Sequence, residues 1–97
     1  MNYLFHEEAE KDLLSIVEYY EECQIGLGLR FSKELYVTID RICKYPLAWK
    51  MIDLKTRRCL MSRFPFGVLY RIVDNRIIIM AIMHLHRKPG YWKNRIL

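Results

Sequence analysis

The period of the hydrophobic residues changes at Pro46, and this change constrains the fold more than any other feature of the chain. Before Pro46, apolar residues recur every three or four positions, which is the spacing of an amphipathic helix. After Pro46, β-branched and aromatic residues dominate and the spacing falls towards two, which is typical of strands. We therefore expect a helical part followed by a sheet.

The helical part is predicted to be a hairpin of two antiparallel helices that follows a short strand at Tyr3-Leu4-Phe5. The apolar positions that share one helical face are Ala9, Leu13, Ile16, Val17 and Tyr20, then Phe31, Leu35, Thr38, Ile39 and Ile42. The first helix is expected from Glu7 to about Cys23, with Gly26 as its terminator because glycine adopts the left-handed conformation cheaply. Pro46 is expected to close the second helix.

Four strands are predicted after Pro46, at residues 50–53, 57–64, 68–74 and 76–85, with turns at Pro65-Phe66-Gly67 and Asp74-Asn75. The first is so short that the sheet counts three to four strands in this half. Helices on one face of a mainly antiparallel sheet make the fold α+β, and the other face, or one end of it, should stay open. Residues 1–97 contain no repeat and no linker, so we expect a single domain.

Charge is distributed unevenly along the chain. Residues 1–22 carry seven acidic side chains and one basic one, giving −6, whereas residues 23–97 carry fifteen basic and four acidic ones, giving +11. A basic field of this kind attracts polyanions, either nucleic acid or an acidic protein segment. The sign of the charge does not choose between them.

Several classes of protein are disfavoured by the sequence. No apolar run approaches the roughly 20 residues of a membrane span, and the N-terminus lacks the features of a signal peptide, so we expect a cytoplasmic protein with no membrane partner. The three cysteines, Cys23, Cys43 and Cys59, fit neither a disulfide framework nor a metal motif and are expected to be buried apolar residues. We expect no cofactor.

The basic residues of the sheet and of the C-terminal tail are the first candidates for binding an anion or a target. They are Arg57, Arg58, Arg63, Arg71, Arg76, Arg87, Lys88, Lys93 and Arg95. Strand alternation predicts that Arg57 and Arg63 share one face and that Arg58 lies on the other. The alternative is that these charges only protect sheet edges and keep the protein soluble.

The second candidate is the segment from His84 to Trp92. Strand geometry should place His84 and His86 on the same side, and Pro89-Gly90 should turn the chain so that Tyr91 and Trp92 fold back. Imidazole, guanidinium and phenol groups would supply the acid, base and cation needed to cleave RNA through its 2′-hydroxyl. Two alternatives remain: the aromatic pair caps the core, or the histidines bind zinc, for which four ligands at familiar spacing are missing.

The order of motifs resembles the RelE/ParE superfamily of toxins from bacterial type II toxin-antitoxin systems, and its ParE-like branch in particular. The matching pieces are Glu-Ala-Glu-Lys-Asp-Leu with Tyr19-Tyr20-Glu21, Gly26-Leu27-Gly28-Leu29-Arg30-Phe31, Arg57-Arg58-Cys59-Leu60, Arg63-Phe64-Pro65-Phe66-Gly67 with Tyr70-Arg71-Ile72, and His84 to Trp92. They span nearly the whole chain. The resemblance implies growth inhibition, plasmid stabilization and a cognate antitoxin whose disordered segment folds on the toxin.

The resemblance also implies two molecular targets. RelE-like members cut messenger RNA on the ribosome without a metal, whereas ParE-like members poison DNA gyrase without catalysis. RelE-like nucleases are similar in carrying an arginine where this chain has Gly67, followed by a C-terminal arginine and tyrosine. Arg87 and Tyr91 stand for these two, with Arg63 or Arg71 as substitutes. In a nuclease, His84 of the C-terminal segment would be the base. Loss of one phosphate-binding cation favours gyrase as the target over the ribosome and its messenger RNA. His86 and Trp92 would join the basic residues in binding the target, and a non-toxic basic interaction module is a further alternative.

Overall fold

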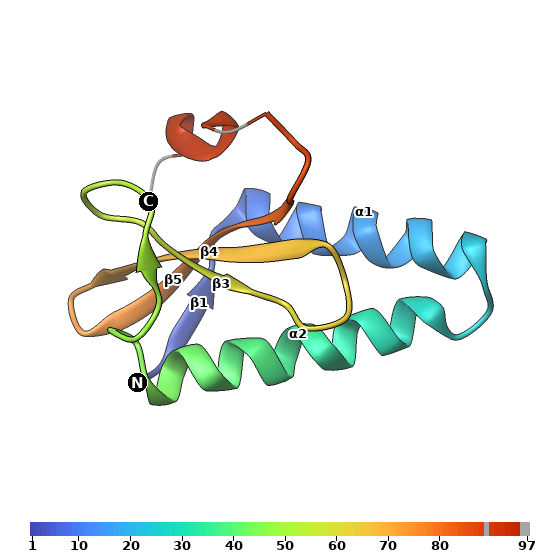
Figure 1. Cartoon of the computed structure of the whole chain (residues 1–97), viewed down its shortest axis with the longest axis horizontal. Helices are drawn as coiled ribbons and strands as arrows, with labels where there is room; N and C mark the ends of the chain where they lie inside the picture. Colours follow the sequence, from blue (N-terminus) through green and yellow to red (C-terminus); the bar gives the residue numbers. More distant parts are fainter. Residues whose placement is uncertain (89, 96–97) are drawn as a thin grey trace.

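The computed structural model describes residues 1–88 and 90–95. Its elements are β1 (Tyr3–Phe5), α1 (Glu7–Cys23), α2 (Leu27–Lys44), β2 (Lys50–Met51), β3 (Arg57–Leu60), β4 (Phe66–Val73), β5 (Arg76–His84) and the 3₁₀ helix η1 (Tyr91–Asn94), as Figure 1 shows. The expected order of a strand, a helical hairpin and a sheet is confirmed. Pro89, which was expected to help turn the chain, lies outside the described residues.

The five strands form one sheet in the order β1-β5-β4-β3-β2. β1 runs parallel to β5, with Tyr3 opposite Ile77, and the other neighbours are antiparallel. The first and last strands are therefore adjacent. The predicted strand at 57–64 is too long, because β3 ends at Leu60. Met61 then donates its backbone N–H to the carbonyl of Phe66 at 2.9 Å, which closes a loop between them. Arg63 consequently lies in that loop and shares no strand face with Arg57.

Glycines shape the junction between the two helices. Gly26 has a φ of 88° and precedes α2, so the expected left-handed residue stands at the start of the second helix rather than at the end of the first. The Glu21 carboxylate accepts hydrogen bonds from the N–H groups of Gly26 and Gly28 at 2.9 and 3.1 Å, which caps α2. A Cβ at Gly28 would lie 2.7 Å from the Val17 carbonyl oxygen, so only glycine allows the helices to approach this closely.

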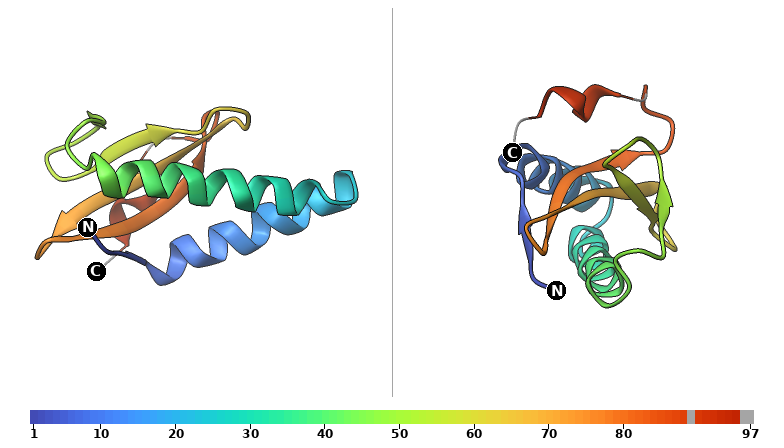
Figure 2. Two further views of the ribbon diagram at one scale, coloured as in Figure 1. Left: turned by 90° about the horizontal axis from the view of Figure 1, so that it is seen from below. Right: turned by 90° about the vertical axis from the view of Figure 1, so that its left-hand side faces the viewer.

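Both helices cover the same face of the sheet (Figure 2). The main core between them contains Ala9, Leu13, Phe31, Leu35, Ile39, Ile42, Cys59, Met61, Phe66, Val68, Tyr70, Ile77, Ile79 and Ile82. The opposite face is less open than expected, because a second cluster of Leu69, Ala81, Met83 and Trp92 covers part of it. The tail thus folds back over the sheet, and its aromatic pair takes part in a core.

The cysteines do not share one environment. Cys59 is buried in β3 and Cys43 is partly buried, but Cys23 is exposed at the end of α1, so the expectation that all three are buried is wrong for Cys23. Position 23 lies where the helix enters the hairpin turn, beyond the stretch of α1 that packs on the sheet.

Loss of stability at high pH is expected from Tyr70, which is buried in the core and donates a hydrogen bond to the Pro46 carbonyl at 2.6 Å. Burial raises the pKa of Tyr70 to about 12. Because the folded-state pKa exceeds the unfolded value, this contribution is complete below about pH 10 and is lost as the pH rises through about 12. The rise in the pKa of Tyr70 from 10.0 to about 12 corresponds to about 3 kcal/mol of stability. Urea unfolding at increasing pH should show this loss.

The Tyr70→Phe variant should lack this component of the pH dependence. Tyr45→Phe, which alters an exposed tyrosine, should retain it. An identical alkaline slope in wild type and Tyr70→Phe would show that Tyr70 does not cause it.

Candidate target-binding surface

A β-bulge in β5 decides where the C-terminal groups point. Leu69 pairs with Ala81 whereas Tyr70 pairs with Ile79, so Met80 is an extra residue on β5. The alternation of side chains reverses there, and His84 faces the helices, with its ring 5.0 Å from that of Phe66. His84 therefore lies on the face opposite Trp92, which packs with the second cluster.

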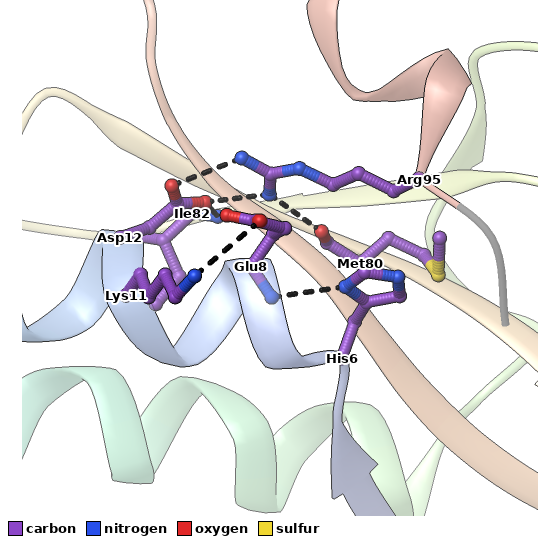
Figure 3. Close-up of polar contacts among 7 residues, drawn as sticks. All are labelled: His6, Glu8, Lys11, Asp12, Met80, Ile82 and Arg95. Atoms are coloured by element: carbon purple, nitrogen blue, oxygen red, sulfur yellow. Dashed lines mark hydrogen bonds and ion pairs between the residues drawn. The ribbon is translucent and has the colours of Figure 1, made fainter.

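β1 pairs with β5 only as far as Ile79. Beyond the bulge, an ion pair takes the place of β1 and binds the backbone of β5. Arg95 Nη1 and Nη2 donate to the two carboxylate oxygens of Asp12 at 2.8 and 3.1 Å, and Nη1 also donates to the Met80 carbonyl at 2.8 Å. Asp12 Oδ2 in turn accepts the Ile82 N–H at 3.1 Å (Figure 3). Asp12 and Arg95, which we call the clamp, thus satisfy the free edge of β5 and fasten the tail to α1.

The clamp is largely removed from water. The side chains of Arg95 and Asp12 are 12% and 14% exposed. Burial by itself would lower the pKa of Arg95, but the hydrogen bond and charge of Asp12 outweigh it and raise that pKa above its usual value. Arg95, expected to bind an anionic target, is therefore already paired inside the fold.

Two further arginines of the expected set hold the fold together. Arg57 donates to the carbonyls of Leu47 and Trp49 at 3.2 and 2.8 Å and so ties down the loop after α2. Arg71 is 9% exposed, and its Nε donates to Thr56 Oγ1 at 3.0 Å. Arg57, Arg71 and Arg95 thus have partners within the fold, and their part in binding a target stays a prediction.

Arg87 and Tyr91 are brought together in the tail. The Arg87 guanidinium carbon lies 3.7 Å from the centre of the Tyr91 ring, which is a cation–π contact. The Tyr91 hydroxyl is buried and has no hydrogen-bond partner in the described part of the chain. Burial raises the pKa of Tyr91, with a further rise from the charge of Asp12 that Arg87 and Arg95 oppose. The arginine is thus held in place, while the phenol is not presented to solvent.

His84 lies in a small hollow that sequence reasoning did not find. The hollow has a volume of about 180 Å³ and is lined by Lys11, Asp12, Ser15, Ile16, Phe66, Ile82, His84 and Arg87. Lys11 and Ser15 were missed because they belong to the acidic N-terminal segment. Their four-residue spacing on α1 was the available signal. His86 donates its backbone N–H to His84 Nδ1 at 3.1 Å, and the two rings lie 5.4 Å apart, so these histidines are neighbours.

Most of the expected cations that remain accessible lie on the tail, on β3 or in the loop between β3 and β4, whereas the exposed Arg76 lies apart from them at the turn between β4 and β5. Arg63, His86, Arg87, Lys88 and Lys93 are exposed and Arg58 is half-buried. The Leu85 N–H donates to the Pro65 carbonyl at 2.9 Å, which joins the Arg63 loop to the start of the tail. We call Arg58, Arg63, His86, Arg87, Lys88 and Lys93 the basic end. In residues 1–88 and 90–95, no three His, Cys, Asp or Glu side chains gather as metal ligands.

Trp92 anchors the tail and is expected to contribute strongly to stability, since it is 4% exposed over Leu69, Ala81 and Met83. Trp92→Ala should lower the free energy of unfolding by about 3–5 kcal/mol. Trp92→Phe should cost much less, because it keeps an aromatic ring and removes a buried indole N–H that has no partner among the described residues. Thermal unfolding followed by circular dichroism measures both, and equal stability of Trp92→Ala and wild type would contradict the anchoring role.

The chain is similar to a known protein family and to a solved structure. Residues 3–89 match the family described as the ParE toxin of the type II toxin-antitoxin system parDE. A solved chain of the chromosomal ParDE TA system from P. aeruginosa superposes with a TM-score of 0.79 at 17% identity, over 89% of this chain and 97% of that one. At that identity the likeness shows the fold. No curated protein sequence matches significantly.

Proposed function

Because this chain belongs to the ParE toxin family of type II toxin-antitoxin systems, we propose that it arrests bacterial growth by poisoning DNA gyrase in the cytoplasm. A cognate antitoxin binds and neutralises it. The observation that carries this proposal is the basic end, whose accessible cations lie on a tail fastened by Trp92 and the clamp and on the β3 segment and loop before β4. An exposed cationic surface suits a non-catalytic toxin that holds the complex of gyrase and cleaved DNA.

The state of Tyr91 supports a non-catalytic mode of action. A general acid must reach the leaving oxygen of its substrate within hydrogen-bond distance. The Tyr91 hydroxyl is buried, and burial raises the pKa of Tyr91. In addition, Gly67 supplies no cation where the RelE-like nucleases carry one.

The helices of the described residues offer no span long and apolar enough for a membrane.

One observation favours the second candidate, a ribosome-dependent RNA endonuclease. The side chain of Arg58 passes over Gly67. A Cβ added at Gly67 would lie 3.0 Å from Arg58 Cγ. Arg58 would then supply the cation that position 67 lacks, with Arg87 as the second cation, while His84, the expected base, lies on the opposite face of the sheet from Arg58. This candidate requires the tail to move so that Tyr91 becomes accessible.

Purified gyrase distinguishes the candidates. With supercoiled plasmid and the toxin, the proposal predicts loss of supercoiling activity and accumulation of linear DNA after denaturation of gyrase. Translated messages should stay intact. Unchanged gyrase activity together with cuts in messages, absent in Arg87→Ala, would replace the proposal with the nuclease. Expression without any growth arrest would indicate the non-toxic interaction module.

A further inference from the structure

The small hollow at His84, which we call the His84 hollow, is lined by hydrogen-bond donors from three parts of the fold. Lys11 and Ser15 come from α1, one turn apart, His84 ends β5, and Arg87 lies in the tail. The other lining residues are Asp12, Ile16, Phe66 and Ile82. Its volume of about 180 Å³ is below the roughly 300–1,000 Å³ of pockets for drug-sized molecules, so the hollow suits a group of a few heavy atoms.

The hydrogen bond between His84 and His86 decides which nitrogen of His84 can act as a donor. The His86 backbone N–H donates to His84 Nδ1 at 3.1 Å, so Nδ1 must present a lone pair. Neutral His84 therefore carries its ring hydrogen on Nε2. Within residues 1–88 and 90–95, Nε2 has no hydrogen-bond partner. His84 thus has a free N–H donor to offer to a ligand.

The other donors of the His84 hollow also lack a strong acceptor. The Arg87 guanidinium contacts the Tyr91 ring but makes no hydrogen bond or ion pair in the part of the chain that the structure describes. The Ser15 hydroxyl has no partner among the same residues. Lys11 pairs with the Glu8 carboxylate at 3.6 Å, and both of these side chains are exposed. Four donor groups are therefore available to a ligand.

The acidic residue that lines the His84 hollow is already used by the fold. Both carboxylate oxygens of Asp12 accept hydrogen bonds from Arg95, and Oδ2 also accepts the Ile82 N–H. Arg95 therefore balances the charge of Asp12, whereas Lys11 and Arg87 leave the hollow positive. Free donors and positive charge together make an anion the complementary ligand.

We propose that the His84 hollow binds the phosphate group of a small phosphate monoester. Such a group carries close to two negative charges and presents three terminal oxygens, which can accept from the four donor groups. A carboxylate has one charge and two oxygens and leaves more of these donors unpaired. A phosphodiester likewise has one charge and two terminal oxygens, so the site favours a monoester over the backbone of a nucleic acid. The inference does not depend on gyrase being the target of the basic end.

Titration of the isotope-labelled chain with methyl phosphate, followed by NMR, tests the proposal. At about pH 8 the monoester is doubly charged. The amide signals of residues 11–15 and 84–87 should shift and reach saturation. Acetate, the carboxylate comparison, should bind at least about tenfold more weakly than methyl phosphate.

Two variants remove donors from the His84 hollow. Lys11→Gln combined with Ser15→Ala should weaken binding of methyl phosphate by at least about tenfold. The matched control, Lys33→Gln combined with Ser32→Ala, makes the same two changes on α2, outside the hollow, and should bind within about twofold of wild type. His84→Phe, which removes the Nε2 donor and keeps an aromatic ring, should weaken binding by about threefold or more.

Three results would overturn the proposal. One is the absence of saturable shifts at the lining residues, and another is equal affinity of methyl phosphate for wild type and for the Lys11 and Ser15 variant. The third is displacement of methyl phosphate by a DNA oligonucleotide without a terminal phosphate, whose own binding falls in parallel in that variant, because the hollow would then bind a phosphodiester. Should His84→Phe fail to fold by circular dichroism, the variant of the exposed Lys11 and Ser15 decides.

Discussion

Asp12→Ala is expected to lower the free energy of unfolding by about 3–5 kcal/mol, because it leaves the largely buried Arg95 without its counter-ion. The same change removes the acceptor of the Ile82 N–H at the free edge of β5. Urea unfolding measures the loss. Arg95→Ala should lower the free energy of unfolding by less, because Asp12 then still accepts the Ile82 N–H and is left more exposed to water.

The matched control is the exposed pair of Lys11 and Glu8, whose charged atoms are 3.6 Å apart with side chains 64% and 49% exposed. Glu8→Ala should change stability by less than about 1 kcal/mol. The double variant of Asp12 and Arg95 should lose less than the sum of the single variants, because the pair acts as a unit. Additive losses would show that the clamp is two independent contacts.

Arg87→Glu combined with Lys88→Glu is expected to abolish growth arrest when the chain is expressed without its antitoxin. Both side chains are exposed at the basic end, and reversing them places like charges against an anionic target, which costs several kcal/mol. Survival after induction should therefore rise by about a hundredfold or more. Colony counts before and after induction measure the change.

The control for this pair is Lys55→Glu combined with Arg76→Glu, at exposed sites outside the basic end, which alters net charge equally and should stay toxic. Thermal unfolding of the purified variants separates loss of the surface from loss of the fold, since Arg87 also contacts the Tyr91 ring. Full toxicity of a folded Arg87 and Lys88 variant would remove the basic end from the mechanism.

Local sequence patterns were enough to predict the helices. α1 spans Glu7–Cys23 as expected, because its apolar residues repeat at helical spacing and the turn residues that follow are unambiguous. The sheet was predicted less well at its edges. A bulge such as that at Met80 leaves no mark in a run of apolar residues, and it reverses every side chain that follows.

The sequence indicated which residue types the candidate site offers, but not which of them the fold itself uses as internal partners. The tail was rightly expected to fold back, but the partner of Arg95 lies 83 residues away in α1, where the acidic segment suggested only a solvated face. Arg57 and Arg71 looked like surface charges and instead hold backbone and hydroxyl groups of neighbouring segments. Counting charges along a sequence cannot separate these roles, since they depend on contacts between distant elements.

The most direct test of the basic end is amide hydrogen exchange of the chain with and without gyrase bound to DNA. Our account predicts slower exchange at residues 84–88 and 91–95 in the complex, with little change at β2. Protection confined to other segments, or binding that leaves the tail exchanging as it does in the free chain, would contradict the claim that the toxin meets its target there.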